Sequence, residues 1–220
     1  MNVLAVGAHP DDVELGCGAA LLAHRRAGHE VTLLVMTSGE NGPQQERSRR
    51  AEQEDAAALL GATVIWGGFQ DGAVPADGAA ISVVEAALAA TAANLVYIPA
   101  SADTHQDHRA TASAALSAAR RARRLLSYET PTTVNFTPTF YIDAAGLVEG
   151  KLELLRAHLS QVLKNGLVDL EAVEAQARYR GFQSRMREAE AFETSRFVWD
   201  IAIPAVTPID MSVTSQEATK

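Results

Sequence analysis

Two short segments of the chain gather the residue types that bind metal ions and move protons. His9-Pro10-Asp11-Asp12 follows an apolar run near the N-terminus, and Asp103-Thr104-His105-Gln106-Asp107-His108 follows a later apolar run. Imidazole and carboxylate groups bind zinc and other divalent ions, and a site with three protein ligands keeps one position open for water. Zinc lowers the pKa of that water toward ~7, which yields a nucleophile at neutral pH. The two segments therefore predict hydrolytic metal chemistry, provided that the fold brings them together.

Simpler interpretations exist for each segment. Asp11 or Asp12 could cap the helix that follows, since two aspartates before a helix are common. A lone histidine is usually structural, but three of the six histidines fall within these two segments. The remaining histidines lie in or beside predicted helices, where a surface or interface role is expected, and they are His24, His29 and His158.

The predicted order of strands and helices places both segments at one edge of a sheet. Apolar, β-branched runs predict strands over 2–6, 31–37, 63–66, 95–98, 125–128, 139–143 and 196–201. Ala-, Leu- and charge-rich runs predict helices over 15–27, 44–60, 79–91, 110–121, 147–159 and 170–192. This alternation predicts an α/β fold, a Rossmann-like and mostly parallel sheet with helices on both faces. The first and fourth strands flank the point where the strand order of such a sheet reverses, so the loops after them could face each other at the carboxyl ends, where ligands bind.

Composition limits the function classes further. With 220 residues the chain fits one domain, predicted over 1–203, followed by a polar tail over 204–220. The net charge of −8 argues against nucleic acid as a partner, and no apolar run approaches the ~20 residues of a membrane span. A single cysteine fits a reducing cytoplasm. Gly16-Cys17-Gly18 begins like a dinucleotide-binding motif but lacks its last glycine, which argues against a nucleotide-dependent oxidoreductase.

The two segments resemble the motifs of the LmbE-like, or PIG-L-type, zinc de-N-acetylases. That family carries His-Pro-Asp-Asp after its first strand and His-x-Asp-His after a later one. The similarity continues in order through Thr37-Ser38-Gly39-Glu40, the helix from Arg49 to Gly61, Asp71-Gly72, Tyr128-Glu129, Tyr141–Asp143, Lys151, His158–Gln161, Arg180-Gly181 and Ala189–Phe192. It therefore spans roughly Val3 to Phe192.

The resemblance implies a metal site with one Zn²⁺ per chain, for which another divalent ion could substitute. Its ligands would be His9, Asp12 and His108. Asp11 would be the general base that takes a proton from the attacking water.

The resemblance implies further roles around that site. His105 would be the acid that stabilises the tetrahedral oxyanion or protonates the leaving amine, and Asp107 would orient a histidine through its ring N–H. Arg49 and Asp71 are expected to contact substrate, although Arg49 could lie on a solvated helix face and Asp71 could only turn the chain.

The function implied is zinc-dependent removal of an N-acetyl group from a small amino sugar or sugar conjugate. Sugar-thiol deacetylases of the mycothiol type carry a tyrosine near the position of Asp103, and its absence argues against a mycothiol-pathway substrate. Two alternatives remain: a noncatalytic metal- or sugar-binding module on the same fold, and an amidase with a non-sugar N-acyl substrate. A homo-oligomer is compatible with the sequence.

Overall fold

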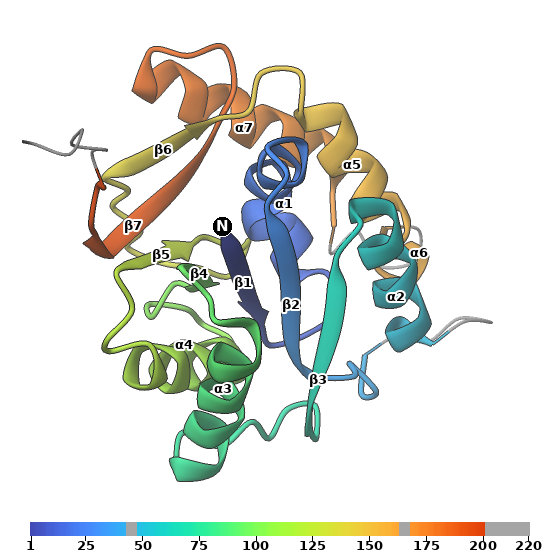
Figure 1. Cartoon of the computed structure of the whole chain (residues 1–220). Coiled ribbons are helices and arrows are strands. Elements are labelled where there is room, and N and C mark those ends of the chain that lie inside the picture. Colours follow the sequence, from blue (N-terminus) through green and yellow to red (C-terminus); the bar gives the residue numbers. More distant parts are fainter. Residues whose placement is uncertain (43–47, 163–167, 201–220) are drawn as a thin grey trace, which may run out of the picture.

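A computed structural model describes residues 1–42, 48–162 and 168–200, and these form one α/β unit around a seven-stranded sheet (Figure 1). The strand order is β3-β2-β1-β4-β5-β7-β6, in which β1 to β5 pair in parallel and β7 pairs antiparallel with β5 and β6. The strands are β1 (Asn2–Gly7), β2 (Glu30–Thr37), β3 (Thr63–Phe69), β4 (Leu95–Pro99), β5 (Arg124–Tyr128), β6 (Phe140–Asp143) and β7 (Ala189–Phe197). The predicted mostly parallel, Rossmann-like sheet is confirmed.

Helices cover both faces of the sheet, as expected. They are α1 (Asp12–Arg26), α2 (Arg49–Leu60), α3 (Gly78–Thr91), α4 (Gln106–Ala118), α5 (Val148–Arg156), α6 (Leu159–Val162) and α7 (Leu170–Ser184). Figure 1 shows α1 and α2 on one side of the sheet and α3 and α4 on the other. In the part of the chain described, no helix combines the length and apolar character that a membrane span requires.

Alternating side chains of the strands build a core on each face. Val3 and Ala5 pack with residues of α1 and α2, whereas Leu4 and Val6 pack with residues of α3 and α4. Helices α5 and α7 add a third apolar cluster on the outer side of α1. Strands β1 and β4 are direct neighbours, so the loops at their carboxyl ends lie side by side.

The C-terminal part of the fold differs from the sequence prediction. The helix predicted over 170–192 ends at Ser184, because Arg185 adopts a left-handed conformation with φ 64°. The next segment, Ala189–Phe197, is strand β7, so the strand predicted over 196–201 begins earlier. Its alanines and glutamates favour a helix intrinsically, but pairing with β5 and β6 overrides that preference.

Other boundaries shift at the ends of elements. Helix α1 begins at Asp12, three residues before the predicted start, and the helix predicted over 44–60 begins at Arg49, after the N-cap Ser48. Residues 44–47 of that prediction, and the whole predicted tail over 204–220, lie outside the described residues.

The Gly16-Cys17-Gly18 segment lies inside α1 and makes a packing contact. A Cβ atom at Gly16 would lie 1.9 Å from Cδ2 of Tyr128, so glycine allows the tyrosine ring to pack against the helix backbone. The Tyr128 hydroxyl donates to Val6 O (2.8 Å), and the buried Cys17 Sγ donates to Val13 O (3.4 Å). Gly16 thus serves helix–sheet packing.

A buried ion pair bridges an interruption in α1, where Cys17 departs from helical geometry (φ −144°, ψ 20°). Glu190 of β7 accepts hydrogen bonds from the backbone N–H groups of Ala19 (3.0 Å) and Ala20 (2.7 Å). Lys151 of α5 donates to Glu190 Oε1 (2.7 Å) and to the backbone carbonyl oxygen of Leu15 (2.7 Å). The pair therefore satisfies backbone groups that the break in the helix leaves without partners.

We expect Lys151→Met to lower the free energy of unfolding by about 3 kcal/mol, because it leaves the buried Glu190 carboxylate without its cation. Urea denaturation followed by circular dichroism measures this change. Arg156→Met is the control, since Arg156 lies on the same helix but makes exposed pairs with Glu149 and Glu153, and it should leave the midpoint unchanged. Equal effects of the two substitutions would contradict a special role for Lys151.

Candidate active site

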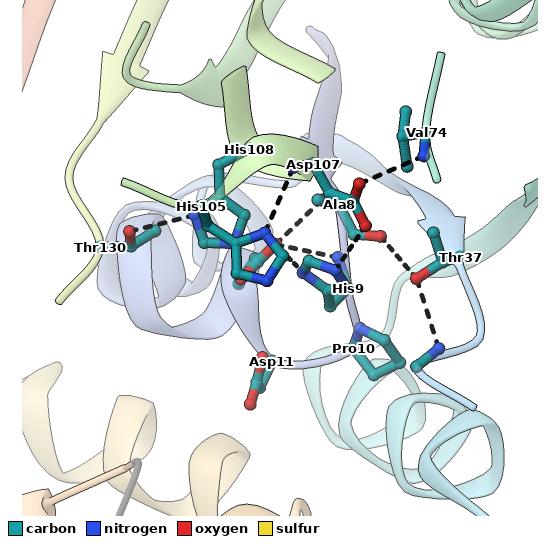
Figure 2. A network of polar contacts seen from close by, with 12 residues as sticks. Ala8, His9, Pro10, Asp11, Thr37, Val74, His105, Asp107, His108 and Thr130 are labelled. Carbon is teal, nitrogen blue, oxygen red and sulfur yellow. Dashed lines mark hydrogen bonds and ion pairs between the residues drawn. The ribbon is translucent and has the colours of Figure 1, made fainter. Parts of the chain in front are cut away.

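The loops after β1 and β4 bring three histidine rings together (Figure 2). His9 lies in the first loop, and His105 and His108 lie at the start of α4 in the second. The ring centroids are 4.7 Å apart for His9 and His105, 5.3 Å for His9 and His108, and 4.7 Å for His105 and His108. One ring nitrogen from each lies within 4.8 Å of the others, which is close enough for a shared ion.

Asp12 links the two loops. Its Oδ2 atom accepts the backbone N–H groups of Ala8 and His9, each at 2.9 Å, and lies 3.6 Å from His9 Nδ1. Its Oδ1 atom lies 3.3 Å from His108 Nε2. The carboxylate thus turns back toward the strand end. The side chain of the N-cap residue, Asp11, makes no capping hydrogen bond either, so neither aspartate has the capping role that the sequence left open.

Asp107 and Asp71 face the other nitrogen of His9. Their carboxylate oxygens each lie 3.2 Å from His9 Nε2. Asp107 also accepts the backbone N–H groups of Gly72 (2.7 Å) and Val74 (3.2 Å), which fix its position. The sequence analysis expected Asp107 to orient a histidine, and the histidine that it faces is His9.

Asp103, the first residue of the second segment, is a site residue to which the sequence assigned no role of its own. Its Oδ2 atom lies 3.2 Å from His108 Nδ1 and accepts hydrogen bonds from Thr130 Oγ1 (2.9 Å) and Thr133 Oγ1 (3.0 Å). Its Oδ1 atom accepts the backbone N–H of His105 (2.8 Å). Its position two residues before His105 was the available signal. A carboxylate on the far nitrogen of a histidine is a common means of orienting a metal ligand.

His105 is the N-cap residue of α4. Its Nδ1 atom accepts the backbone N–H of Asp107 (3.2 Å), so the neutral ring carries its hydrogen on Nε2. Burial and the neighbouring His9 and His108 lower its pKa below the usual value. His105 is therefore a neutral hydrogen-bond donor at neutral pH.

Asp11 stands apart from the histidine cluster (Figure 2). Its backbone is left-handed, with φ 98°, which is uncommon for a residue other than glycine. Arg49 donates from Nη2 to Pro10 O (2.6 Å), and that nitrogen lies 3.4 Å from Asp11 Oδ1. Burial raises the pKa of Asp11 to about 6, against the opposing effect of Arg49. Arg49 is itself buried, so it does not lie on a solvated face.

A buried polar network supports Asp11 from behind. Gln53 accepts the Asp11 backbone N–H (3.2 Å) and donates to Glu14 Oε1 (2.6 Å). His158 is fully buried, with its Nε2 atom 3.6 Å from Glu14 Oε2, which excludes the surface role, one of the two that the sequence predicted for it. Although burial alone would lower it, Glu14 raises the pKa of His158. The apolar and charged residues around it in sequence gave no sign of this burial.

The site is rich in negative charge, contributed by buried aspartates at positions 11, 12, 71, 103 and 107. Burial opposes charge on His9, but Asp107, Asp12 and Asp71 raise its pKa to about 12. Asp12 and Asp103 likewise raise the pKa of His108 to about 10, despite burial. The carboxylates thus stabilise positive charge at these two rings. Protons or a divalent cation can supply that charge. Imidazole nitrogens beside a carboxylate suit Zn²⁺.

A cavity of about 450 Å³ opens over this cluster. Besides the histidines, its walls include Asp11, Arg49, Asp71 and Gln161. Asp71 Oδ2 accepts the backbone N–H of Asn41 (3.1 Å), so it also holds a turn, as one interpretation of the sequence allowed. All eight residues predicted for the site therefore lie in or beside one cavity, with Asp107 behind His9.

Comparison with known proteins shows similarity to a deacetylase family. The family model described as PIG-L, GlcNAc-PI de-N-acetylase, matches residues 4–119. The chain is 34% identical over 148 residues to an uncharacterized deacetylase, YaiS, of Escherichia coli (strain K12), covering 64% of this chain and 80% of that protein.

Solved structures share the fold. The conserved protein TT1542 from Thermus thermophilus is 28% identical, with a TM-score of 0.82 over 91% of this chain and 97% of its own. An N,N'-diacetylchitobiose deacetylase from Pyrococcus horikoshii is 24% identical, with a TM-score of 0.76 over 87% and 82% of the two chains. Because the family match spans more than half of the chain and includes both loops of the site, this protein belongs to the PIG-L family, also called LmbE-like.

Proposed function

We propose that this protein is a Zn²⁺-dependent hydrolase that removes an N-acetyl group from an amino sugar or a sugar conjugate. The observation that carries the proposal is the divergence of two adjacent carboxylates. Asp12 lies 3.3 Å from His108 Nε2, within the histidine cluster, whereas Asp11 lies 3.4 Å from Arg49 at its edge. One carboxylate is thus available to hold a cation and the other to take a proton.

His9, Asp12 and His108 would hold the ion. Asp107 faces His9 Nε2 and Asp103 faces His108 Nδ1, so both rings have their other nitrogen on the side of Asp12. This pattern supports the ligand set, because carboxylates commonly hold the far nitrogen of a metal-bound histidine. When bound, Zn²⁺ activates water at neutral pH and polarises the substrate carbonyl.

Two residues would handle the charge and protons of amide hydrolysis. Asp11, with its pKa raised to about 6 by burial, accepts a proton from the attacking water. As the C–N bond breaks, the protonated Asp11 returns that proton to the nitrogen of the leaving amine. His105 donates a hydrogen bond from Nε2 to the carbonyl oxygen as negative charge develops there. The neutral ring suffices for this step, so the oxyanion role fits His105 better than that of an imidazolium acid.

An N-acetylated sugar is the substrate class that the relatives favour. The family description names GlcNAc-PI and the Pyrococcus protein is named for diacetylchitobiose, both of which carry N-acetyl groups. Arg49 and Asp71 are the polar side chains of the cavity that we propose contact such a substrate. Amine release from a panel of N-acetylated sugars and simple N-acetyl amines separates this function from a non-sugar amidase. A module without turnover would bind metal and release no amine from any of them.

Removing either histidine ligand should remove the metal ion. Purified protein is expected to hold about one Zn²⁺ per chain, and His9→Ala and His108→Ala should each lose most of it. Elemental analysis after dialysis measures the content, with His29→Ala as the control because His29 pairs with His24 away from the site. Stoichiometric metal in both ligand variants would contradict the assignment.

The adjacent variants Asp11→Asn and Asp12→Asn should fail in different ways. Asp11→Asn is expected to keep its metal and lose at least ~10²-fold in kcat, because an amide cannot act as a general base. Asp12→Asn should instead weaken metal binding, since an amide oxygen is a poorer ligand than a carboxylate. Metal titration and kinetics at saturating Zn²⁺ separate the two effects. Equal metal loss in both variants would overturn the division of roles.

The acidic limb of the pH profile should move when Arg49 is replaced. Asp11 must be ionised to act as a base, so kcat/KM falls as the pH drops through its pKa. Arg49 lowers that pKa, so Arg49→Gln should raise it and shift the limb upward by about one pH unit. The value of kcat/KM would then fall about 10-fold well below pH 6 and change little near pH 8.

Arg50→Gln is the matched control for that experiment. Arg50 lies on the same helix but is exposed, where it pairs with Glu54 and covers the Trp66 ring. Its loss should leave the limb in place. An unmoved limb in Arg49→Gln would assign the acidic limb to a group other than Asp11.

A further inference from the structure

A second hollow of about 330 Å³ adjoins the candidate active site. It lies between the loop after β5 and the first turns of α7. Leu15, Pro131 and Val168 line both hollows, so the two share an apolar boundary. Ala172 and Val173 of α7 extend the apolar wall.

The charged groups of the second hollow already have partners. Glu129 accepts two hydrogen bonds from the Arg180 guanidinium (2.7 and 2.6 Å). Asp169 caps α7 by accepting the backbone N–H groups of Glu171 (2.9 Å) and Ala172 (3.2 Å). Both carboxylates therefore already have hydrogen-bond donors, and no cationic ligand is required to pair with them.

Apart from the histidine cluster and the ion proposed there, permanent positive charge is scarce along both hollows. Among the described residues that line them, Arg49 alone carries a permanent positive charge, and it is engaged by Pro10 O and Asp11. In the second hollow, a phosphate or carboxylate on the substrate would face Glu129 and Asp169, with no basic side chain among the described residues that line it. The lining thus favours an uncharged ligand.

The size of the second hollow suits a substantial apolar group. A cavity of about 150 Å³ is enough to hold a benzene molecule, and ligand pockets start near ~300 Å³. At about 330 Å³, the second hollow can take an aromatic ring or a short alkyl chain. A bare monosaccharide in the first hollow would leave it without an occupant.

We propose that the second hollow binds an apolar, uncharged group carried by the substrate, so that the preferred substrate is an N-acylated amino sugar with such a group attached. The inference rests on the proposed function for the position of the reacting amide. The group could be a substituent on the sugar or a longer acyl chain on its nitrogen, and both supply the same chemistry to Leu15, Pro131, Val168 and Ala172. An amino sugar that carries a phosphate in place of the apolar group would be a poor substrate.

Four substrates test the proposal with the full-length, zinc-loaded protein. They are N-acetylglucosamine, its phenyl β-glycoside, N-octanoylglucosamine and N-acetylglucosamine 1-phosphate. We expect kcat/KM to be at least ~10-fold higher than for N-acetylglucosamine with the phenyl glycoside or the octanoyl compound, and lower with the phosphate. Whichever of the two apolar compounds is preferred identifies where the apolar group is attached. Equal values for all four compounds would overturn the proposal.

Filling the hollow tests its location. Ala172 is an exposed helix residue on the wall, so Ala172→Trp places an indole there with little cost to the fold. It should lower the preference for the apolar compound over N-acetylglucosamine by about 10-fold. Ala175→Trp is the matched control, because Ala175 is exposed on the same helix but does not line the hollow, and it should leave the preference unchanged. Thermal unfolding of both variants verifies the fold. An unchanged preference in Ala172→Trp would show that the apolar group binds elsewhere.

A binding measurement separates this inference from the proposed function. Calorimetric titration of zinc-loaded Asp11→Asn with the phenyl glycoside, with and without Ala172→Trp, reports occupancy without turnover. If Ala172→Trp weakens binding about 10-fold while the wild-type protein hydrolyses none of the compounds, the apolar binding site in the hollow is supported and the proposed hydrolase function is refuted. Hydrolysis of N-acetylglucosamine, with no effect of Ala172→Trp on either measurement, would refute the hollow alone.

Discussion

The candidate site depends on one carboxylate that folds the chain back onto the end of β1. Asp12 accepts two backbone N–H groups, at 2.9 Å each, through one oxygen and faces His108 through the other. Hydrogen bonds to an ionised acceptor are about twice as strong as neutral ones. This tight turn requires Asp11 to adopt φ 98°, a conformation that costs of order 1–3 kcal/mol. Helix α2 stabilises it, because Gln53 and Arg49 bind the backbone of the same turn.

Strands and helices that carry no predicted metal ligand also support the site. Glu190 of β7 and Lys151 of α5 hold together the interrupted helix α1, whose first residue is Asp12. Glu52 of α2 similarly accepts the N–H and hydroxyl of Ser160 (2.9 and 2.6 Å), which ties α2 to α6. The loops at the sheet edge are thus fixed by contacts that reach across most of the fold. A rigid support of this kind is what a metal site with defined ligand geometry requires.

The sequence was most informative where chemistry and element boundaries coincide. The segments 9–12 and 105–108 stand at strand ends, so the parallel topology alone predicts that they meet. The role of Asp103 was not predictable in this way, because it depends on threonines that approach it only in the folded chain. Residues 189–192 favour a helix by composition, yet Glu190 is buried in β7, where Lys151 and two backbone N–H groups bind its carboxylate. Since Lys151, the nearest of these partners, lies 39 residues away in sequence, no local pattern could have indicated the burial.

The charge balance at Asp11 links the electrostatics of the site to its chemistry. A general base works best when its pKa lies near the pH at which the enzyme operates. Burial and the neighbouring Asp12 raise the pKa of Asp11, while Arg49, His158 and His9 lower it, and the result is about 6. Without Arg49, burial would raise the pKa of Asp11 further and favour its protonated form at neutral pH. Full exposure would instead lower the pKa and make Asp11 a weak base. In the proposed mechanism, the buried arginine therefore lets a carboxylate in an acidic cavity stay ionised while keeping enough basicity to take a proton from water.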